Sequence, residues 1–193
     1  MIWFTSDTHF FHSNAIKFCN RPFNDVKEMD NKLIENWNQR VQKDDEIYVI
    51  GDFIWPKYKS LGDVSKILNR LNGDIHLIPG DHDISKYVLS DAAPGKVVVH
   101  DKVHILTGLK DVEPIVLCHW SFRIWPQSHF NSIHLFGHSH NNNKETPLME
   151  YGRSFNVGVD VWNYSPISLL TVLDKVKTLG DNPNFIKNRD RQS

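Results

Sequence analysis

Residues of the types that bind metals gather in five short clusters, and each cluster closely follows a hydrophobic run. Short apolar runs bounded by Gly or Pro are typical of buried strands. In sheets covered by helices, ligands bind beyond the carboxyl ends of the strands, so we expect the clusters to form one polar site. They are Asp7 with His9 after 2–4, Asp52 after 47–50, Asp81-His82-Asp83 after 75–78, His119 after 115–118, and His138 with His140 after 133–136.

The chemistry of these clusters favours a site for two metal ions. Carboxylates and imidazoles without a thiolate suit Mn²⁺, Fe or Zn²⁺ better than Ca²⁺ or a structural zinc. Two ions about 3.5–4 Å apart bind phosphate oxygens and lower the pKa of a bridging water, which then attacks phosphorus. Seven ligands are too many for one ion and enough for two if one carboxylate bridges: Asp7, His9, Asp52, Asp81, His119, His138 and His140.

Two of the clusters place their ligands only two positions apart. Asp7 and His9 form one pair, and His138 and His140 form the other. Such pairs converge on one site only where the backbone leaves regular strand geometry, unless each member addresses a different ion. We expect Gly137 to supply the conformational freedom for this turn at the second pair.

Cleavage of a phosphoester also requires a proton for the leaving alkoxide. His82 lies between two carboxylates, and histidine is the side chain suited to proton transfer near neutral pH, so we expect it to act as the general acid. We expect Asp83 to hold this imidazole in the productive tautomer. The structural alternatives are a supporting role for His82 without proton transfer and a helix N-cap role for Asp83.

Three further residues are candidates for contacts with the substrate. His12 follows His9 by three positions, and the alternative for it is a surface or helix-capping histidine. Arg21 lies in the turn before the first long helix, where a helix-flanking ion pair is the alternative. Arg123 follows His119 by four positions and has the chemistry to bind phosphate or stack on a base, although a structural role is favoured.

Composition predicts a single soluble domain over 1–179 with a polar, frayed tail over 180–193. Of 193 residues 40% are hydrophobic, 23% are charged, and the net charge is −1. This balance argues against strong nonspecific binding to nucleic acid or anionic membranes. The sequence shows neither a signal peptide nor an apolar run of membrane-spanning length, and Cys19 and Cys118 lack metal-binding spacing. We therefore expect a cytoplasmic protein with reduced thiols.

Apolar spacing in the first half predicts alternating strands and helices. Helical periodicity covers 14–19, 25–41 and 63–71, with Asn24 or Asp25 as N-cap of the second helix. Together with the apolar runs, the two longer helices make a β-α-β-α-β progression, which implies parallel strands joined by crossover helices.

The second half is richer in strand-like runs. The runs at 97–99, 103–106 and 115–118 are separated by polar turns too short for helices, which predicts a meander or a second sheet. The segments 133–136 and 155–161 extend it. The expected closing helix covers 166–179 with Ser165 as N-cap, although 167–173 fits a strand equally well.

Taken in order, the clusters resemble the motifs of the calcineurin-like metallophosphoesterase superfamily. The resemblance covers residues 1 to 165, and the segments 20–23 and 156–160 are similar to a small bacterial and phage branch. It implies an α/β (α+β) fold, a two-sheet β-sandwich flanked by helices in four α/β/β/α layers. The matching motifs are Asp7-x-His9, Gly51-Asp52, Gly80-Asp81-His82-Asp83, His119, and Gly137-His138-x-His140.

The resemblance also implies how the ligands are shared between two divalent ions. Asp52 would bridge them, and His82 would take the acid or phosphate-contacting role. We expect Mn²⁺, with Fe, Zn²⁺ or Ni²⁺ as alternatives. The implied ligands are Asp7, His9 and His140 for the first ion, and Asp81, His119 and His138 for the second.

This chain departs from the family pattern at Asp81, where the third motif of the family has Asn. An Asn ligand gives its carbonyl oxygen to the metal while its NH₂ group donates to a phosphate oxygen, and an ionised Asp has no donor. We therefore expect tighter metal binding and weaker phosphate binding than with Asn.

The sequence thus predicts a metal-dependent hydrolase of a phosphomonoester or phosphodiester with a small or nucleotide-like substrate and no membrane partner. One alternative is a metal-binding or scaffold protein of the same fold with weakened catalysis, which Asp81 favours. The other is a nuclease, which would be expected to carry a basic track that this sequence does not show.

Overall fold

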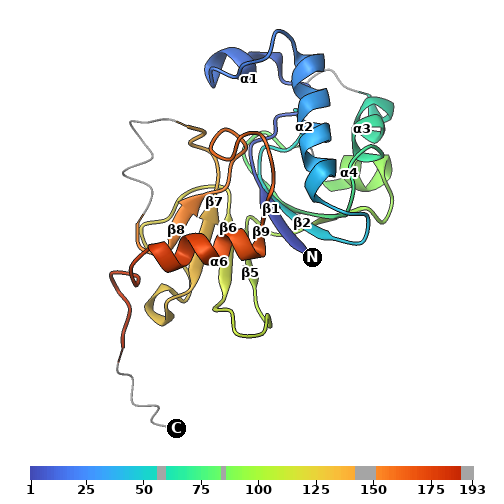
Figure 1. Ribbon diagram of the computed structural model, residues 1–193. Helices are drawn as coiled ribbons and strands as arrows, with labels where there is room; N and C mark the ends of the chain where they lie inside the picture. The colour runs from blue at the N-terminus through green and yellow to red at the C-terminus, as the bar shows by residue number, and fades with distance from the viewer. Residues whose placement is uncertain (56–59, 84–85, 142–150, 188–193) are drawn as a thin grey trace.

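The computed structural model describes residues 1–55, 60–83, 86–141 and 151–187. They form two sheets packed face to face and flanked by helices (Figure 1), which confirms the predicted fold class. The five-stranded sheet has the order β4-β3-β2-β1-β9 and the four-stranded sheet the order β5-β6-β7-β8. The strands are β1 (Ile2–Thr5), β2 (Glu46–Ile50), β3 (Asp74–Ile78), β4 (Val97–Val99), β5 (Val103–Leu106), β6 (Ile115–Cys118), β7 (Ile133–Phe136), β8 (Ser154–Asn156) and β9 (Ile167–Ser168).

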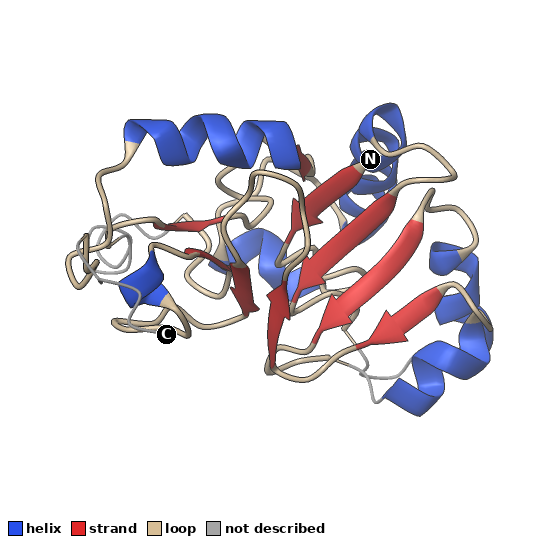
Figure 2. Ribbon diagram, turned by 90° about the horizontal axis from the view of Figure 1, so that it is seen from below, coloured by secondary structure: helices blue, strands red, loops and turns tan. Residues whose placement is uncertain are grey.

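The five-stranded sheet contains the predicted parallel progression, with β1 to β4 parallel to one another. Figure 2 shows helices on one side of this sheet and the four-stranded sheet on its other side. Asp25 caps α2 by accepting from the Glu28 amide, as predicted, and Ser60 and Asp63 form a capping box on α3. The helices are α1 (Ser13–Phe18), α2 (Val26–Arg40), α3 (Leu61–Leu68), α4 (Lys86–Ala92), the 3-10 helix η1 (Ser128–Phe130) and α6 (Leu169–Thr178).

The prediction of a second sheet after residue 96 is confirmed, whereas the alternative of a meander and the place of 97–99 in that sheet were wrong. β4 does not join a second sheet, because it pairs in parallel with β3 after the crossover helix α4. The second sheet is not a meander either: β5 and β6 are antiparallel, whereas β6, β7 and β8 run parallel. Connections between parallel strands must cross over, so longer segments separate these strands.

The closing segment combines both predicted alternatives. β9 is a two-residue strand antiparallel to β1, and α6 follows it directly. Ser168, not Ser165, is the N-cap, since its side chain accepts from the Thr171 amide. The tail is not frayed at its start, because Asn182 is buried and its side-chain NH₂ donates to the carbonyls of Ser128 and Ser132.

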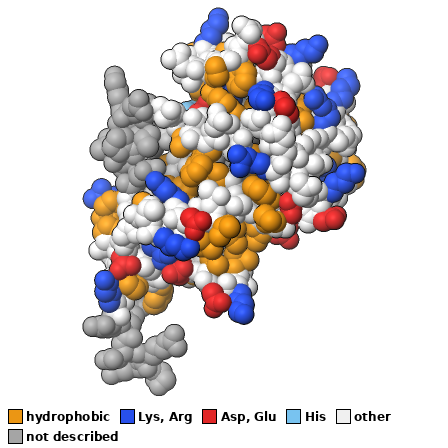
Figure 3. Space-filling model, in the orientation of Figure 1, with side chains coloured by type: hydrophobic (Ala, Val, Ile, Leu, Met, Phe, Trp, Pro, Cys, Tyr) orange, Lys and Arg blue, Asp and Glu red, His pale blue; other side chains and the backbone are white. Residues whose placement is uncertain are grey.

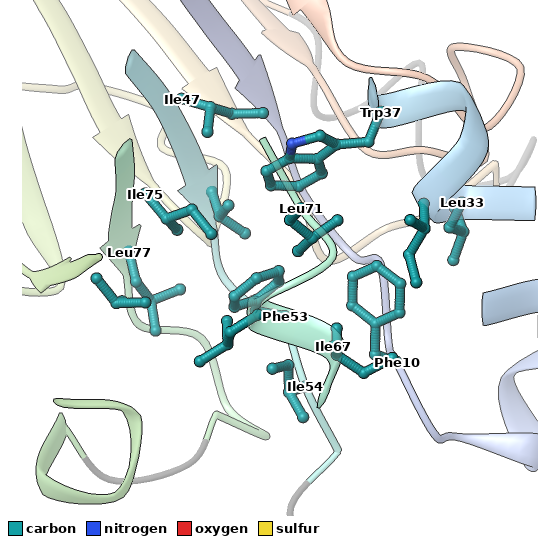
Figure 4. Close-up of a cluster of buried hydrophobic side chains, with 14 of the residues drawn as sticks. Phe10, Leu33, Trp37, Ile47, Phe53, Ile54, Ile67, Leu71, Ile75 and Leu77 are labelled. Atoms are coloured by element: carbon teal, nitrogen blue, oxygen red, sulfur yellow. The ribbon is translucent and has the colours of Figure 1, made fainter. Parts of the chain in front are cut away.

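Two apolar clusters hold the layers together. The strand side chains alternate, so that Trp3 packs toward the helices and Phe4 toward the four-stranded sheet. Figure 4 shows the helix-side cluster, in which Phe10 and Phe53 lie with Trp37 of α2. No helix in the described part of the chain is long and apolar enough to span a membrane.

Candidate metal centre

The backbone segments that carry the first two clusters stay paired beyond their strands. The His9 amide donates to the Asp52 carbonyl at 2.9 Å, and the Phe10 amide to the Phe53 carbonyl at 3.0 Å. Both phenylalanines are fully buried, with ring centroids 5.8 Å apart. Phe10 and Phe53 follow the predicted ligands His9 and Asp52 directly and are anchored in the core. This anchoring fixes the positions of the two ligands.

Five of the predicted ligands adopt a left-handed backbone, which confirms that the chain leaves strand geometry at the paired clusters. Residues other than glycine rarely take positive φ values, and each such residue costs about 1–3 kcal/mol. The surrounding pairing and packing must offset this strain. The φ values are 57° for Asp7, 52° for His9, 53° for Asp52, 68° for His138 and 49° for His140.

Glycines beside the predicted ligands leave room for neighbouring side chains of the site. Gly137 does not have the positive φ that we expected of it, because the left-handed residue is its neighbour His138. A Cβ at Gly137 would instead collide with Ser6 Oγ and Asp7 Oδ2. Gly51 combines both requirements, since its φ is +82° and a Cβ there would collide with the imidazole of His119.

The structure brings six of the predicted ligands together as two triads. Within each triad, one potential ligand atom per residue lies within 4.8 Å of the others. The described residues also include a third such group, Asp7, Asp52 and His119, which joins the two triads. The triads are Asp7, His9 and His140, and Asp81, His119 and His138.

Asp52 lies between the triads. Its Oδ2 atom is 3.5 Å from Nε2 of His9 and 3.5 Å from Nε2 of His119. Its other oxygen, Oδ1, accepts from the His82 amide at 3.0 Å. One carboxylate oxygen therefore faces one histidine from each triad, which is the geometry that a bridging ligand requires.

The surroundings of the His119 ring indicate whether a cation would fit the site. Its Nδ1 atom lies 2.9 Å from the Ile50 carbonyl, so Nδ1 carries the proton and donates. In the neutral ring, Nε2 then holds a lone pair. This Nε2 atom is buried and has no hydrogen-bond partner within the described ranges. A buried lone pair without a partner is costly, so Nε2 takes up either a proton, which the nearby carboxylates favour, or a metal ion in its place.

His140 is oriented from behind by a buried ion pair. Its Nδ1 atom lies 2.6 Å from Asp160 Oδ2, and Arg21 holds the same carboxylate with two hydrogen bonds of 2.8 Å. Arg21 also donates to the backbone carbonyls of Asp7 and Thr8. The Nε2 atom of His140 is thereby turned toward Asp7, whose Oδ1 is 4.0 Å away.

Sequence reasoning assigned no role to Asp160 or Asn156. The Asn156 side chain donates to Ser139 Oγ and the His140 carbonyl and accepts from the Gly158 amide, so it fixes the loop that carries the last triad member. The available signal was the segment 156–160, which matched the family branch but lay outside the ligand clusters.

Without a metal ion, the buried carboxylates of the site raise the pKa of two of its histidines. Burial opposes protonation of His119, but the carboxylates of Asp52 and Asp7 outweigh it and raise its pKa to about 9. Burial likewise opposes protonation of His140, yet Asp160 and Asp7 raise its pKa to about 10. The site therefore favours positive charge, which bound cations would supply.

His82 lies at the surface of the site and lines its cavity. Its ring packs edge-on against Trp55 at 4.9 Å and lies 6.1 Å from the ring of His9. This position is compatible with the predicted contact to a substrate phosphate or leaving group.

Asp83 does not take the predicted role of orienting His82. Its carboxylate accepts three backbone hydrogen bonds, from the amides of Asp52, Phe53 and Gly80, at 2.7–2.9 Å. Burial raises the pKa of Asp83, while the amides of Gly80 and Phe53 act in the opposite direction. Asp83 thus ties together two strand-end loops, and it positions the Asp52 backbone instead of the imidazole.

The three candidates for substrate contact have different positions. His12 lines the cavity, where its ring stacks on Trp55 at 3.9 Å. The prediction for Arg21 was wrong, since its side chain is 0% exposed and lies behind the ligands. Arg123 is exposed and lies over the ring of Tyr151 at 4.3 Å. It is not among the described residues that line the cavity.

A cavity of about 720 Å³ opens in front of the triads. Its lining includes His9, Asp52, His82, His138 and His140. Asp7 and His119 are fully buried behind this surface. A phosphoester in the cavity would therefore meet both triads from one side, with solvent on the other.

Comparison with known proteins identifies the family of this chain. A family model for calcineurin-like phosphoesterases matches residues 1–188. The chain belongs to this family. An uncharacterized protein of Methanocaldococcus jannaschii is 36% identical over 188 residues, which are 93% of this chain and 97% of the relative. The Gene 66 protein of Mycobacterium phage L5 is 33% identical over 81 residues, 42% of this chain and 39% of the relative.

A solved structure has a fold similar to that of this calcineurin-like chain. It is a protein of unknown function from Aquifex aeolicus, 25% identical, with a TM-score of 0.69 over 91% of this chain and 98% of that chain. The match to the Methanocaldococcus jannaschii relative and to this structure extends over nearly the full length of each chain, so it is a match to a whole fold.

Asp81, the departure from the motif of the calcineurin-like family, lies in the more exposed triad. The side chains of Asp81 and His138 are 43% and 47% exposed, whereas Asp7 is 0% and His140 is 22% exposed. Trp120 Nε1 donates to Asp81 Oδ2 at 3.1 Å. The Asp81 carboxylate thus accepts a hydrogen bond from a neighbouring side chain. The second triad is also more open to solvent than the first.

Proposed function

We propose that this chain is a dinuclear metal-dependent phosphoesterase that hydrolyses a small or nucleotide-like phosphomonoester or phosphodiester. The observation that carries this proposal is Asp52 Oδ2, which lies 3.5 Å from one histidine of each triad. Two divalent ions, when bound, polarise the phosphate oxygens and lower the pKa of a water that serves as nucleophile. The carboxylate and imidazole donors favour Mn²⁺, with Fe²⁺, Zn²⁺ and Ni²⁺ as alternatives.

The protein contributes fixed ligand positions. His119 is oriented by the Ile50 carbonyl and His140 by Asp160, and both rings keep Nε2 free to bind a metal. Such outer partners fix the tautomer and raise the basicity of a histidine ligand. Preorganisation of this kind keeps the donors from rearranging as charge develops on the phosphate.

His82 supplies the proton for the leaving group in this proposal. The attacking water loses a proton to solvent and forms the new bond to phosphorus as the bond between phosphorus and the leaving oxygen breaks. The leaving oxygen takes a proton from a ring nitrogen of His82, which regains one from solvent. The accessible ring in the cavity wall supports this role. The amide of His82 also donates to Asp52, so the ring is held near the bridging carboxylate.

The enzyme proposal is tested with purified protein loaded with Mn²⁺, Ni²⁺, Fe²⁺ or Zn²⁺. Turnover of nitrophenyl phosphate and bis-nitrophenyl phosphate is measured for the natural chain and Asp52→Asn. We expect turnover that requires metal and is lost in the variant. Absence of turnover on both esters with all four metals would refute the proposal that this chain is an enzyme.

The role of His82 is tested by the leaving group. His82→Asn should slow an alkyl phosphodiester by about 10²–10⁴-fold and slow a nitrophenyl ester much less, because nitrophenolate leaves without a proton. Equal losses on both substrates would show that His82 contacts the phosphate without donating a proton.

Asp81 favours one other function, a metal-binding scaffold with weakened catalysis. Its negative charge beside an anionic substrate opposes binding, and it lacks the donor of Asn. Two bound ions without turnover on any ester would support this alternative. A nuclease has less support, because Figure 3 shows acidic and basic side chains interspersed on the face in view, with no basic track across it.

A further inference from the structure

The cavity in front of the triads extends well beyond the ligands. Its lining also includes residues of α1 and the turn after it, namely Ala15, Lys17, Phe18, Cys19 and Asn20. Sites that bind drug-sized molecules measure about 300–1,000 Å³, and this cavity of about 720 Å³ lies within that range. A phosphate group alone would leave most of it to solvent, so a larger part of the substrate has room against α1.

Phe18 offers an apolar face in this part of the lining. It is the last residue of α1 and is 79% exposed. Ala15 and Ile16 attach the helix to the protein, since Ala15 is buried and Ile16 packs against the helix-side core. Phe18 is therefore not needed for the core, and its ring is free to stack on a planar group of a ligand.

Lys17 adds a positive charge beside Phe18. It is exposed, and no ion pair or hydrogen bond of its ammonium group occurs within the described residues. It is also the only lysine or arginine among the described residues that line the cavity. An unpaired cation attracts an anionic ligand over a distance of roughly 10 Å at moderate salt.

We propose that α1 forms a nucleoside subsite, with a nucleobase stacked on Phe18 and Lys17 drawing the nucleotide phosphate into the cavity. The substrate class is then a phosphoester that carries a nucleobase. This inference rests on the proposed function for the position of the phosphate, at the two triads. The base stacks on α1 and not on the triads, so it discriminates between substrates without touching the reacting atoms.

A matched pair of ligands isolates the contribution of the base. The methylene phosphonate analogues of adenosine 5′-monophosphate and ribose 5-phosphate have a P–C bond in place of the ester bond, so a phosphoesterase does not hydrolyse them. They share the phosphonate and the sugar, and only the first has a base. Their affinities for the Mn²⁺-loaded protein are measured by titration calorimetry. Base stacking on an aromatic side chain corresponds to roughly five- to 150-fold in affinity, so for an exposed ring we expect a ratio of about ten in favour of the adenosine ligand.

Variants of α1 then test the two residues separately. Phe18→Ala should abolish the ratio and Phe18→Trp should keep it. Lys17→Met should weaken both ligands equally and reduce the salt dependence of binding. Because Phe18 and Lys17 are exposed, all three variants should keep the Tm and the metal content of the natural chain, which are measured alongside.

The outcomes separate this inference from the proposed function. A ratio near one in the natural chain, or a ratio that Phe18→Ala leaves unchanged, would overturn the nucleoside subsite even if nitrophenyl esters are hydrolysed. A ratio that depends on Phe18 in a protein without turnover would support the subsite and refute the enzyme. With turnover, kcat/KM for a dinucleoside monophosphate should fall about tenfold in Phe18→Ala, and that for a diglycerol phosphodiester should stay unchanged.

Discussion

The Nδ1 atom of His140 lies 2.6 Å from Oδ2 of Asp160. Because Arg21 binds the same carboxylate with two hydrogen bonds, the charge of Asp160 is compensated and its orientation is fixed. Burial raises the pKa of Asp160, but His140 and Arg21 outweigh it and lower the pKa overall. A preformed buried network therefore orients His140, which would present its ring to a metal ion bound in the first triad.

Asp160→Asn tests this network. An asparagine keeps the shape but removes the charge that orients and polarises His140. Loss of such an outer partner typically costs 10–100-fold in metal affinity, so we predict a loss of roughly this size for the ion bound by Asp7, His9 and His140. Metal titration measures it, and Asp181→Asn, at an exposed carboxylate, is the control. Equal affinities in the natural chain and Asp160→Asn would contradict the role.

Asp52→Asn tests the bridge. Its Oδ2 atom faces His9 and His119 at 3.5 Å each, and a neutral amide is a poor bridging ligand. We predict that the metal content falls from two ions per chain toward one, and that kcat/KM falls by roughly 100-fold or more because the two-ion clamp is lost. Elemental analysis after gel filtration and steady-state kinetics measure these effects. Two ions bound with unchanged affinity would show that Asp52 does not bridge.

Two glycines with the same backbone angle separate strain from collision. Gly51 and Gly108 both have φ +82°, but a Cβ at Gly51 would collide with His119, whereas a Cβ at Gly108 meets no atom within 4 Å. We predict that Gly108→Ala costs about 1 kcal/mol of unfolding free energy from the backbone alone. Gly51→Ala should cost at least about 2 kcal/mol more and weaken metal binding. Denaturant unfolding measures both, and equal losses would contradict the close packing on His119.

The stability of the metal-free protein should depend on pH in a defined direction. The pKa of His119 is raised to about 9 and that of His140 to about 10, above the unfolded value of about 6.5. Their protonated forms therefore stabilise the fold fully below pH 6.5, and this stabilisation is lost as pH rises through 9 and 10. Each group contributes at most about 1.4 kcal/mol per pH unit, and Tm should fall between pH 7 and pH 10.

Metal binding should release the same protons. At pH 8 the two histidines are protonated without metal and deprotonated as ligands, so saturation should release roughly two protons per chain. Calorimetry in two buffers of different ionisation enthalpy measures this number. A release near zero would mean that these histidines do not bind the ions.

Asp81→Asn restores the family residue. The amide brings back a donor for a phosphate oxygen and removes a negative charge beside the substrate. We predict a lower KM for the phosphoester and a weaker affinity for the more exposed ion, bound by Asp81, His119 and His138. Substrate kinetics at saturating Mn²⁺ and metal titration measure the two effects. Unchanged KM and unchanged metal affinity would show that Asp81 affects neither substrate binding nor metal binding differently from Asn.

The fold and the convergence of the candidate ligands were largely predictable because their signals are local. Each of the five clusters follows an apolar run with a clear boundary, and the carboxyl ends of strands bring such residues to one edge. Membership of β4 in the five-stranded sheet was not predictable, since a three-residue run does not show which neighbour it pairs with. The same holds for β9, whose two residues precede α6 without a break.

The supporting residues of the site were not predictable for a related reason. Arg21 and Asp160 are 139 positions apart, and only the folded chain brings them to His140. The sequence suggested His82, the neighbour of Asp83, as its partner. The actual partners of Asp83 are backbone amides, which carry no signal in the sequence. Patterns in the sequence thus identify ligands by type and position, but the contacts that orient them depend on tertiary structure.

The most direct test of the dinuclear centre is an anomalous difference map from crystals of the protein grown with Mn²⁺. We predict two peaks about 3.5–4 Å apart, the first between Asp7, His9 and His140 and the second between Asp81, His119 and His138, with Asp52 touching both. A single peak, or peaks away from these residues, would contradict the account.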